Sequence, residues 1–248
     1  MNSNMNKYLP ILVAILLLTS CSGSKSDRDK AKNQYQTALN DSITAAEADI
    51  RDCNDRISIL NEEVAGFLQN FAVVDNSNEV ESYYILNGWQ SKYPLTSTGI
   101  VTRIAKNEQL ELIAALKGGT FNRIEVVSDK SSLSSDIVPH DQALNYRREG
   151  LNTVMFSGNK ADSLVMLIAD NSQSPVKINF IEGSSIKGSW QISDDYKRMI
   201  LSTWQLYSSR REQMRLEYKV KMLNEKINLL RSHLLKISDS DTSTEAAE

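Results

Sequence analysis

Cysteine and histidine are scarce in this sequence, and their scarcity excludes several classes of protein. The chain has two cysteines, Cys21 and Cys53, which are too few for the disulfide framework of a small cross-linked domain. It has two histidines, His140 and His233, and neither belongs to a His-x-His or His-Glu-x-x-His pattern. We therefore expect no metal site and no cofactor.

An excess of basic residues is missing as well. The chain has 28 Lys and Arg against 31 Asp and Glu, a formal net charge of −3. Binding to a phosphate backbone requires positive charge, so we expect no nucleic-acid partner.

Recognisable catalytic motifs are also lacking. A serine cluster has no Gly-x-Ser-x-Gly motif around it and is typical of a polar loop. His140 and Asp141 are neighbours in a turn-like sequence, which is typical of a polar surface pair. With no set of nucleophile, base and metal ligands, the sequence predicts that the protein is not an enzyme. The serines of the cluster are Ser131, Ser132, Ser134 and Ser135.

Long hydrophobic runs are limited to one segment, Leu9–Leu18. It has about ten residues, whereas a membrane-spanning helix needs roughly twenty, and Lys7 precedes it. This pattern is typical of a signal peptide, which we assign to residues 1–20.

The residues that follow the apolar run are Leu18-Thr19-Ser20-Cys21, and they resemble the lipobox of bacterial lipoproteins. This resemblance implies that diacylglycerol is attached to the Cys21 sulfur, that signal peptidase II cleaves before Cys21, and that the new terminus is acylated. The alternative is an ordinary signal peptide that leaves Cys21 as a free thiol. In the lipoprotein interpretation, two or more acyl chains on Cys21 hold the protein firmly on the membrane, and residues 21–25 form the linker between this anchor and the first helix.

The residue after the cysteine bears on location. Ser22 stands there instead of Asp, and by analogy with enterobacterial sorting this favours the outer membrane, with the protein facing the periplasm. Display on the cell surface is the alternative, although residues 22–28 lack the acidic run that some exported lipoproteins have.

Glycine and proline divide the rest of the chain. Eight of the ten glycines and three of the four prolines lie between residues 88 and 188, and neither type occurs in 25–65 or after residue 188. Two long helices are therefore expected at residues 26–70 and 193–238, with a turn-rich β-domain at 71–192 and a disordered tail at 239–248.

Each predicted helix carries apolar residues in strictly alternating steps of three and four, which is the seam of a coiled coil. We expect the two helices to form a long antiparallel coiled-coil hairpin; the alternative is parallel pairing between copies of the chain. In the second case Cys53, a seam residue, is placed to form an interchain disulfide. The two seams are Leu39, Ile43, Ala46, Ile50, Cys53, Ile57, Leu60, Val64 and Phe67, and Leu216, Val220, Leu223, Ile227, Leu230, Leu234 and Ile237.

The middle segment has the period of two that is typical of strands. About eight short strands are expected there, so the fold class is α+β with an inserted antiparallel β-sandwich or barrel. The continuous apolar run Leu164–Ala169 is interpreted as a buried strand, and residues 128–152 as a long loop.

Four aromatic residues gather near one predicted strand and its following loop, where they either fill the core or bind a ligand. They are Tyr83, Tyr84, Trp89 and Tyr93.

We expect a lipid-anchored envelope protein whose stalk presents the β-domain to an envelope protein partner. The coiled coil could in addition join copies of the chain into an oligomer. One alternative is a component similar to the periplasmic adaptors of transport assemblies, which also combine coiled-coil hairpins with β-domains. In that family, however, the hairpin is inserted in the β-domains, and here the order is reversed. Another alternative is a surface lipoprotein that binds carbohydrate or peptide through the aromatic cluster.

Overall fold

The computed structural model describes residues 25–75, 82–141 and 143–245. The predicted signal peptide and Cys21 lie outside the described residues. The contacts within the chain define two compact units, and each is described by itself. One unit pairs residues up to 53 with residues from 219 onward, and the other comprises Asn54–Tyr218.

The first unit is made from parts of two long helices, α2 (Lys25–Leu68) and α4 (Asp194–Glu245). The side chains of Ile43 and Ala46 on α2 are buried against Ile227 on α4, as the alternation of apolar steps leads one to expect. Two ion pairs also join the helices, Glu47 with Arg231 at 2.8 Å and Asp49 with Lys219 at 3.9 Å. Further apolar residues pack around this cluster, namely Ile50, Leu223, Leu230 and Leu234.

The ends of the helices differ from the expected ones. Helix α4 continues to Glu245, whereas the sequence analysis ends the helix at residue 238. The extension requires no special residue, because neither glycine nor proline follows residue 188 to interrupt the helical hydrogen bonds.

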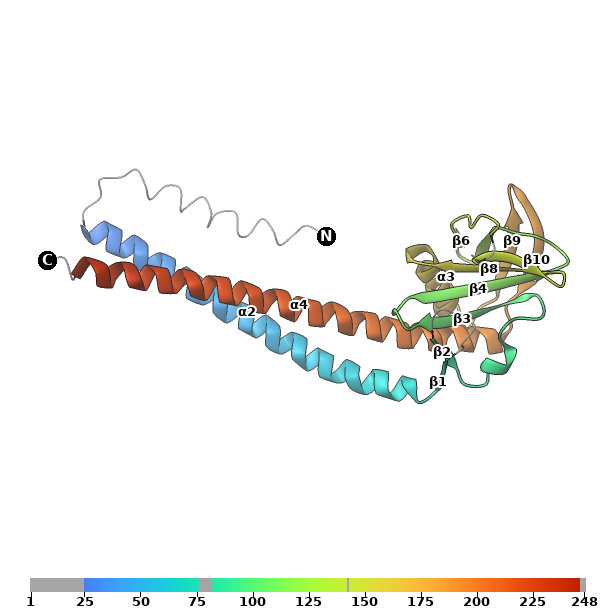
Figure 1. The fold of residues 1–248 in the computed structure, drawn as a ribbon, viewed down its shortest axis with the longest axis horizontal. Coiled ribbons are helices and arrows are strands. Elements are labelled where there is room, and N and C mark those ends of the chain that lie inside the picture. Colours follow the sequence, from blue (N-terminus) through green and yellow to red (C-terminus); the bar gives the residue numbers. More distant parts are fainter. Residues whose placement is uncertain (1–24, 76–81, 142, 246–248) are drawn as a thin grey trace. The chain divides into compact units, whose positions relative to one another are not determined.

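The second unit contains the β-domain, residues 71–192, and its larger sheet has six strands (Figure 1). Every neighbouring pair in it is antiparallel, in the order β1-β2-β3-β4-β8-β7. These strands are β1 (Phe71–Val74), β2 (Tyr83–Leu86), β3 (Gly99–Ala105), β4 (Leu110–Lys117), β7 (Asn145–Arg148) and β8 (Leu151–Ser157).

The smaller sheet has four strands in the order β10-β9-β5-β6, and all its pairs are also antiparallel. They are β5 (Arg123–Ser128), β6 (Ser132–Ser134), β9 (Val176–Glu182) and β10 (Ser185–Gln191). Both sheets have open edges in the described chain, so the predicted barrel is wrong. The predicted class, α+β with antiparallel sheets, is confirmed.

The predicted strand at Leu164–Ala169 is wrong, because these residues belong to helix α3 (Asn159–Asp170). Short apolar runs are ambiguous, and here the run is part of a helical stripe in which every third or fourth residue is buried. The buried apolar residues of α3 are Ala161, Leu164, Val165, Ile168 and Ala169. The helix contacts strands of both sheets, namely β4, β5, β6 and β8.

One hydrophobic core joins the two sheets, α3 and the first part of α4. From the smaller sheet it includes Phe180, which meets Phe121 edge to face with ring centroids 4.9 Å apart. From α4 it includes Met199, whose sulfur lies 3.0 Å from the hydroxyl of the buried Thr102 on β3. Strand β3 is buried along its whole length, since the inner face of the larger sheet meets this core and the outer face is covered in part by residues 87–98.

Candidate functional site

The four aromatic residues singled out in the sequence have different surroundings. Tyr83 and Trp89 are buried, with 4% and 6% of their surface exposed, while Tyr84 and Tyr93 are partly buried. A buried ring cannot offer a face to a ligand, so Tyr83 and Trp89 are excluded. The four residues therefore do not form a common binding surface.

Trp89 belongs to a stack of three rings. It meets Tyr196 of α4 edge to face, with centroids 4.7 Å apart, and Tyr196 meets Trp190 of β10 in the same manner at 4.8 Å. The ammonium of Lys92 lies 4.2 Å from the Trp89 ring centroid, a favourable cation–π distance. This stack anchors the segment after β2 to the body of the domain.

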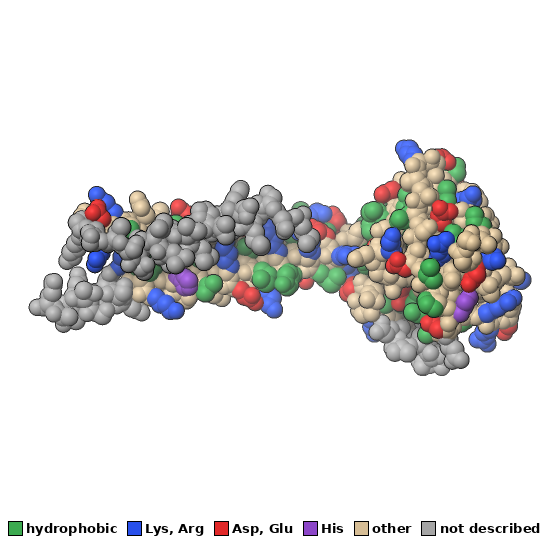
Figure 2. Space-filling view, turned by 90° about the horizontal axis from the view of Figure 1, so that it is seen from above, with side chains coloured by type: hydrophobic (Ala, Val, Ile, Leu, Met, Phe, Trp, Pro, Cys, Tyr) green, Lys and Arg blue, Asp and Glu red, His purple; other side chains and the backbone are tan. Residues whose placement is uncertain are grey.

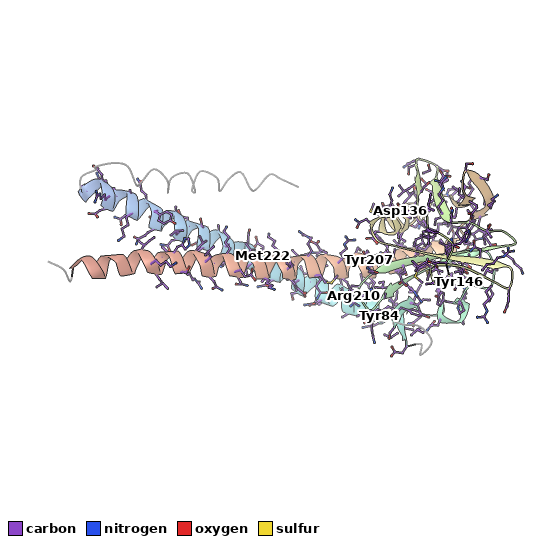
Figure 3. All side chains as sticks on the ribbon, turned by 45° about the horizontal axis from the view of Figure 1, so that its top comes forward. Tyr84, Asp136, Tyr146, Tyr207, Arg210 and Met222 are labelled. Carbon is purple, nitrogen blue, oxygen red and sulfur yellow. The ribbon has the colours of Figure 1, made fainter. Side chains whose placement is uncertain are left out.

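Tyr84 lies elsewhere, beside Arg210 of α4. The guanidinium of Arg210 is 5.0 Å from its ring and forms an ion pair with Glu108. Figure 3 shows Tyr84 and Arg210 next to each other and away from Tyr146.

Arg103 of β3 connects the remaining two tyrosines. Its guanidinium lies 4.2 Å from the Tyr83 ring and 5.2 Å from the Tyr93 ring, and it donates a 3.1 Å hydrogen bond to the Tyr93 hydroxyl. Its Nε also donates to Glu111 on β4, and the Arg103 side chain is 8% exposed. A nearly buried, fully engaged guanidinium thus holds the ring of Tyr93 in one position.

Tyr93 lines a hollow of about 500 Å³ on the outer side of the six-stranded sheet. One wall is the segment Tyr93–Thr96, and the opposite wall is the hairpin of β7 and β8. We name this hollow the Tyr93 groove. Its other lining residues are Lys117, Tyr146, Arg148, Glu149, Leu151 and Thr153.

The β7–β8 hairpin owes its shape to a two-residue turn. Glu149 and Gly150 both have positive φ, 52° and 80°, as the tight turns that match strand twist require. The register then places Tyr146 opposite Thr153 and Arg148 opposite Leu151, so their side chains share the face that lines the groove. The sequence analysis missed Tyr146 and Arg148 because it assigned residues 128–152 to a loop.

The charges of the groove are mainly positive. Lys117 is exposed and forms no ion pair with any described residue, while Arg148 pairs with the adjacent Glu149 at 3.7 Å. One cation of the groove is therefore uncompensated, although the whole chain has a net negative charge. On the face of the β-domain that Figure 2 presents, basic, acidic and hydrophobic side chains are intermixed.

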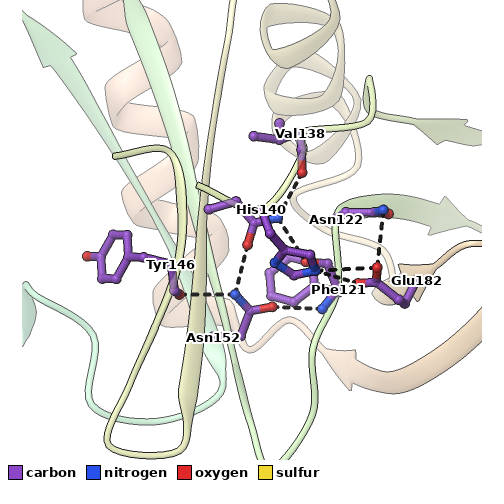
Figure 4. A network of polar contacts seen from close by, with 8 residues as sticks. Phe121, Asn122, Val138, His140, Tyr146, Asn152 and Glu182 are labelled. Carbon is purple, nitrogen blue, oxygen red and sulfur yellow. Dashed lines mark hydrogen bonds and ion pairs between the residues drawn. The ribbon is translucent and has the colours of Figure 1, made fainter. Parts of the chain in front are cut away.

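A buried polar network supports β7 from the other side (Figure 4). Asn152 accepts a 2.7 Å hydrogen bond from the Phe121 backbone N–H and donates to Asn145 and to the Tyr146 carbonyl. Asn145 in turn donates to the carbonyls of Phe121 and Val138. Both asparagines have 1% or less of their surface exposed. Since the Tyr146 ring points away from this network, the network positions the strand and leaves the ring available to the groove.

The loop before β7 is also fixed. The Asp141 carboxylate accepts hydrogen bonds from the backbone N–H groups of Asn145, Leu144 and Ala143, which hold the pKa of Asp141 below its ordinary value. His140 does not pair with Asp141. Its Nε2 lies 3.3 Å from both carboxylate oxygens of Glu182 at the end of β9.

A second polar cluster joins α3 to α4. Tyr207 and Arg211 both donate to the carboxylate of Asp162, and Arg211 also donates to the Tyr207 hydroxyl at 2.9 Å. Burial, and then the neighbouring Asp162 carboxylate, raise the pKa of Tyr207 to about 12. These three mutually hydrogen-bonded side chains connect the two helices.

Other candidates from the sequence are placed as follows. Cys53 is buried and has a free thiol. Ser132 and Ser134 belong to β6, and the Ser135 hydroxyl accepts from the Ile124 backbone N–H, so the serine cluster is part of an edge strand and its turn. Within the described residues no group of three or more His, Cys, Asp or Glu side chains is placed to hold a metal ion. Among them no helix is both long and apolar enough to cross a membrane.

Comparisons with known proteins give no relative from which a role can be taken. No protein-family model, no curated protein and no solved structure matches this chain.

Proposed function

We propose that this chain is a lipid-anchored protein of the bacterial envelope, with a coiled-coil stalk that presents a binding β-domain. In this proposal the protein binds a partner and catalyses no reaction. The observation that carries it is the pairing of the two long helices, α2 and α4, which enclose the β-domain in the sequence.

The pairing of α2 and α4 supports an antiparallel hairpin within one chain. As the residue number rises from Glu47 to Asp49 on α2, the partner on α4 falls from Arg231 to Lys219. The buried residues Leu39, Ile43 and Ala46 of α2 lie at steps of four and three, the spacing expected of a coiled-coil seam. An α-helix of 44 residues, the length of α2, extends about 65 Å at 1.5 Å per residue.

The β-domain supports the binding part of the proposal. We infer that its two sheets pack as an antiparallel sandwich, because inward-facing residues of both sheets share one hydrophobic core. The Tyr93 groove then lies on the outer side of the larger sheet, with a preformed aromatic wall and with Lys117, which has no ion-pair partner among the described residues. Fixed walls are typical of binding sites, because side chains that are already immobilised lose little conformational entropy when a ligand binds.

The anchor is tested by labelling cells with a radioactive fatty acid and fractionating their membranes. The unchanged chain is expected to carry the label and to enter the membrane fraction, and Cys21→Ser is expected to do neither. Cys53→Ser is the matched control, since it removes the other cysteine and should leave labelling unchanged. Labelling of the Cys21→Ser chain would contradict the proposal.

The hairpin is tested by cross-linking two introduced cysteines. Glu47→Cys and Arg231→Cys are combined in a chain with Cys53→Ala and treated with a short bismaleimide. An antiparallel hairpin gives a cross-link within one chain, which runs as a compact monomer on a denaturing gel. Dimers as the main product would show parallel pairing of copies instead, and each single variant is the control.

Location is tested by adding protease to intact and to lysed cells. We propose an outer-membrane anchor that faces the periplasm, so the β-domain should be protected until lysis. Digestion in intact cells would place it on the surface and overturn this part of the proposal.

A further inference from the structure

We propose that the Tyr93 groove binds an acidic oligosaccharide. This inference rests on the proposed binding function of the β-domain and names the class of its ligand.

The two walls of the groove present aromatic rings from separate elements. Tyr93 stands on the segment after β2 and Tyr146 on β7, and 37% of the Tyr146 surface is exposed. An aromatic ring packs well against the C–H faces of a sugar, because its apolar body excludes water. The Tyr93 hydroxyl already accepts a hydrogen bond from Arg103, so Tyr93 contributes chiefly its ring. Two rings on opposite walls suit an extended chain of sugar units better than one small molecule.

Polar groups complete the lining between the rings. The Thr153 side chain shares a face with Tyr146, since the two residues are paired across β7 and β8. The hydroxyl of threonine both donates and accepts a hydrogen bond, as sugar hydroxyls do. Leu95, at 9% exposed, and Leu151 add apolar surface to the lining.

The charge of the groove specifies an acidic sugar instead of a neutral one. Lys117 has no carboxylate partner among the described residues, and Arg148 is paired only with a neighbouring exposed glutamate. A carboxylate on the ligand would give Lys117 a partner at the end of β4, next to Leu151 on β8. Electrostatic complementarity of this kind selects between ligands of similar shape.

The same features argue against an acidic peptide. A peptide strand commonly pairs with an exposed sheet edge, and β7 is such an edge. At β7 the backbone of Asn145 is already occupied, because its N–H donates to Asp141 and its carbonyl accepts from the Asp141 N–H. Only Tyr146, Arg147 and Arg148 remain in this four-residue strand, and so short an edge offers little backbone for a peptide strand to pair with.

The wall that carries Tyr93 is built in advance. Arg103 is nearly buried beneath it and fixes the Tyr93 hydroxyl, while Trp89 anchors the start of the same segment against Tyr196. The opposite wall is fixed by the Asn145–Asn152 network. The Tyr93 ring and the strand that carries Tyr146 are therefore in place before a ligand arrives.

The test is calorimetric titration of the full chain, purified in detergent, with tetragalacturonate as the probe. We expect saturable binding that weakens as sodium chloride is added, because the carboxylates meet Lys117. The neutral tetrasaccharide of galactose should bind at least tenfold more weakly. Equal binding of the two sugars, no binding of either, or equal binding of tetraglutamate would overturn the proposal.

Two variants locate the site. Lys117→Gln and Tyr146→Ala should each raise the dissociation constant for tetragalacturonate about tenfold, which corresponds to about 1.4 kcal/mol. Lys160→Gln and Tyr218→Ala are matched controls, since both residues are exposed and lie outside the groove, and they should change nothing. An unchanged constant in both groove variants would show that the sugar binds elsewhere.

The titration is independent of the anchor and of the stalk. A failed titration with normal labelling of Cys21 would remove the ligand class and leave the proposed function in place. Successful titration with unlabelled Cys21 would do the reverse.

Discussion

The hydroxyl of Tyr207 on α4 donates a 2.8 Å hydrogen bond to the Asp162 carboxylate in the first turn of α3. Both residues are buried, and Arg211 completes the cluster from one turn further along α4. Helix α3 contacts strands of both sheets, so this bond fixes α4 to the element that joins them.

The raised pKa of Tyr207 predicts a loss of stability in alkaline solution. The pKa of Tyr207 is about 12 in the folded chain, whereas the ordinary value for tyrosine, which applies to the unfolded chain, is 10. Folding therefore favours the neutral phenol. The stabilisation from this residue is complete below pH 10 and is lost as the pH rises towards 12. Denaturant unfolding measured between pH 7 and pH 11.5 should show this loss. Tyr207→Phe should remove that part of the pH dependence and cost about 1–2 kcal/mol at pH 7. Tyr218→Phe, at an exposed position of the same helix, should do neither.

The buried asparagines predict a strongly destabilising substitution. Asn152→Ala would leave the Phe121 N–H, the Tyr146 carbonyl and the Asn145 side chain each short of a partner. We expect the free energy of unfolding to fall by roughly 2–4 kcal/mol, because buried polar groups without partners are costly. Asn159→Ala at an exposed position should change it by less than about 0.5 kcal/mol. A similar small loss in Asn152→Ala would show that the network adds little.

The seam of the helical unit predicts a contrast between two residues of α4. Ile227 is 4% exposed and packs on Ile43 and Ala46, whereas Leu229 is 59% exposed. Ile227→Ala should cost roughly 2–4 kcal/mol and lower the melting temperature followed by far-ultraviolet circular dichroism. Leu229→Ala removes a similar volume from the surface and should leave the melting temperature almost unchanged. Equal effects would mean that Ile227 is not part of a packed seam.

Arg103 predicts that lysine cannot replace arginine at this position. Arg103→Lys keeps a charge near Glu111 and loses the planar group that faces the Tyr83 and Tyr93 rings. We expect a loss of about 1–2 kcal/mol and a weaker near-ultraviolet dichroism signal from the tyrosines. Arg148→Lys, whose side chain is 83% exposed, should have no effect on stability. An unchanged tyrosine signal in Arg103→Lys would show that the guanidinium does not order Tyr93.

The long helices and several strands could be predicted from the sequence, because residue patterns within short segments determine them. Proline is absent from α2 and α4, whose one glycine is Gly66 near the end of α2, and the alternating steps of Leu39, Ile43 and Ala46 indicate which face of α2 is buried. Period-two alternation likewise marks β5 and β9, because successive side chains of a strand point to opposite faces.

The tertiary structure decided the short polar strands and the identity of the groove. Strands β6 and β7 have three and four residues and little apolar alternation, so only their partners β5 and β8 define them. Leu164–Ala169 is helical because Ala161, Leu164 and Ile168 form a buried stripe against both sheets, a pairing that no short window contains. Tyr93 and Tyr146 are 53 positions apart in the chain, and they line one groove because the long-range pairing of β4 with β8 places the β7–β8 hairpin in the same sheet as β3.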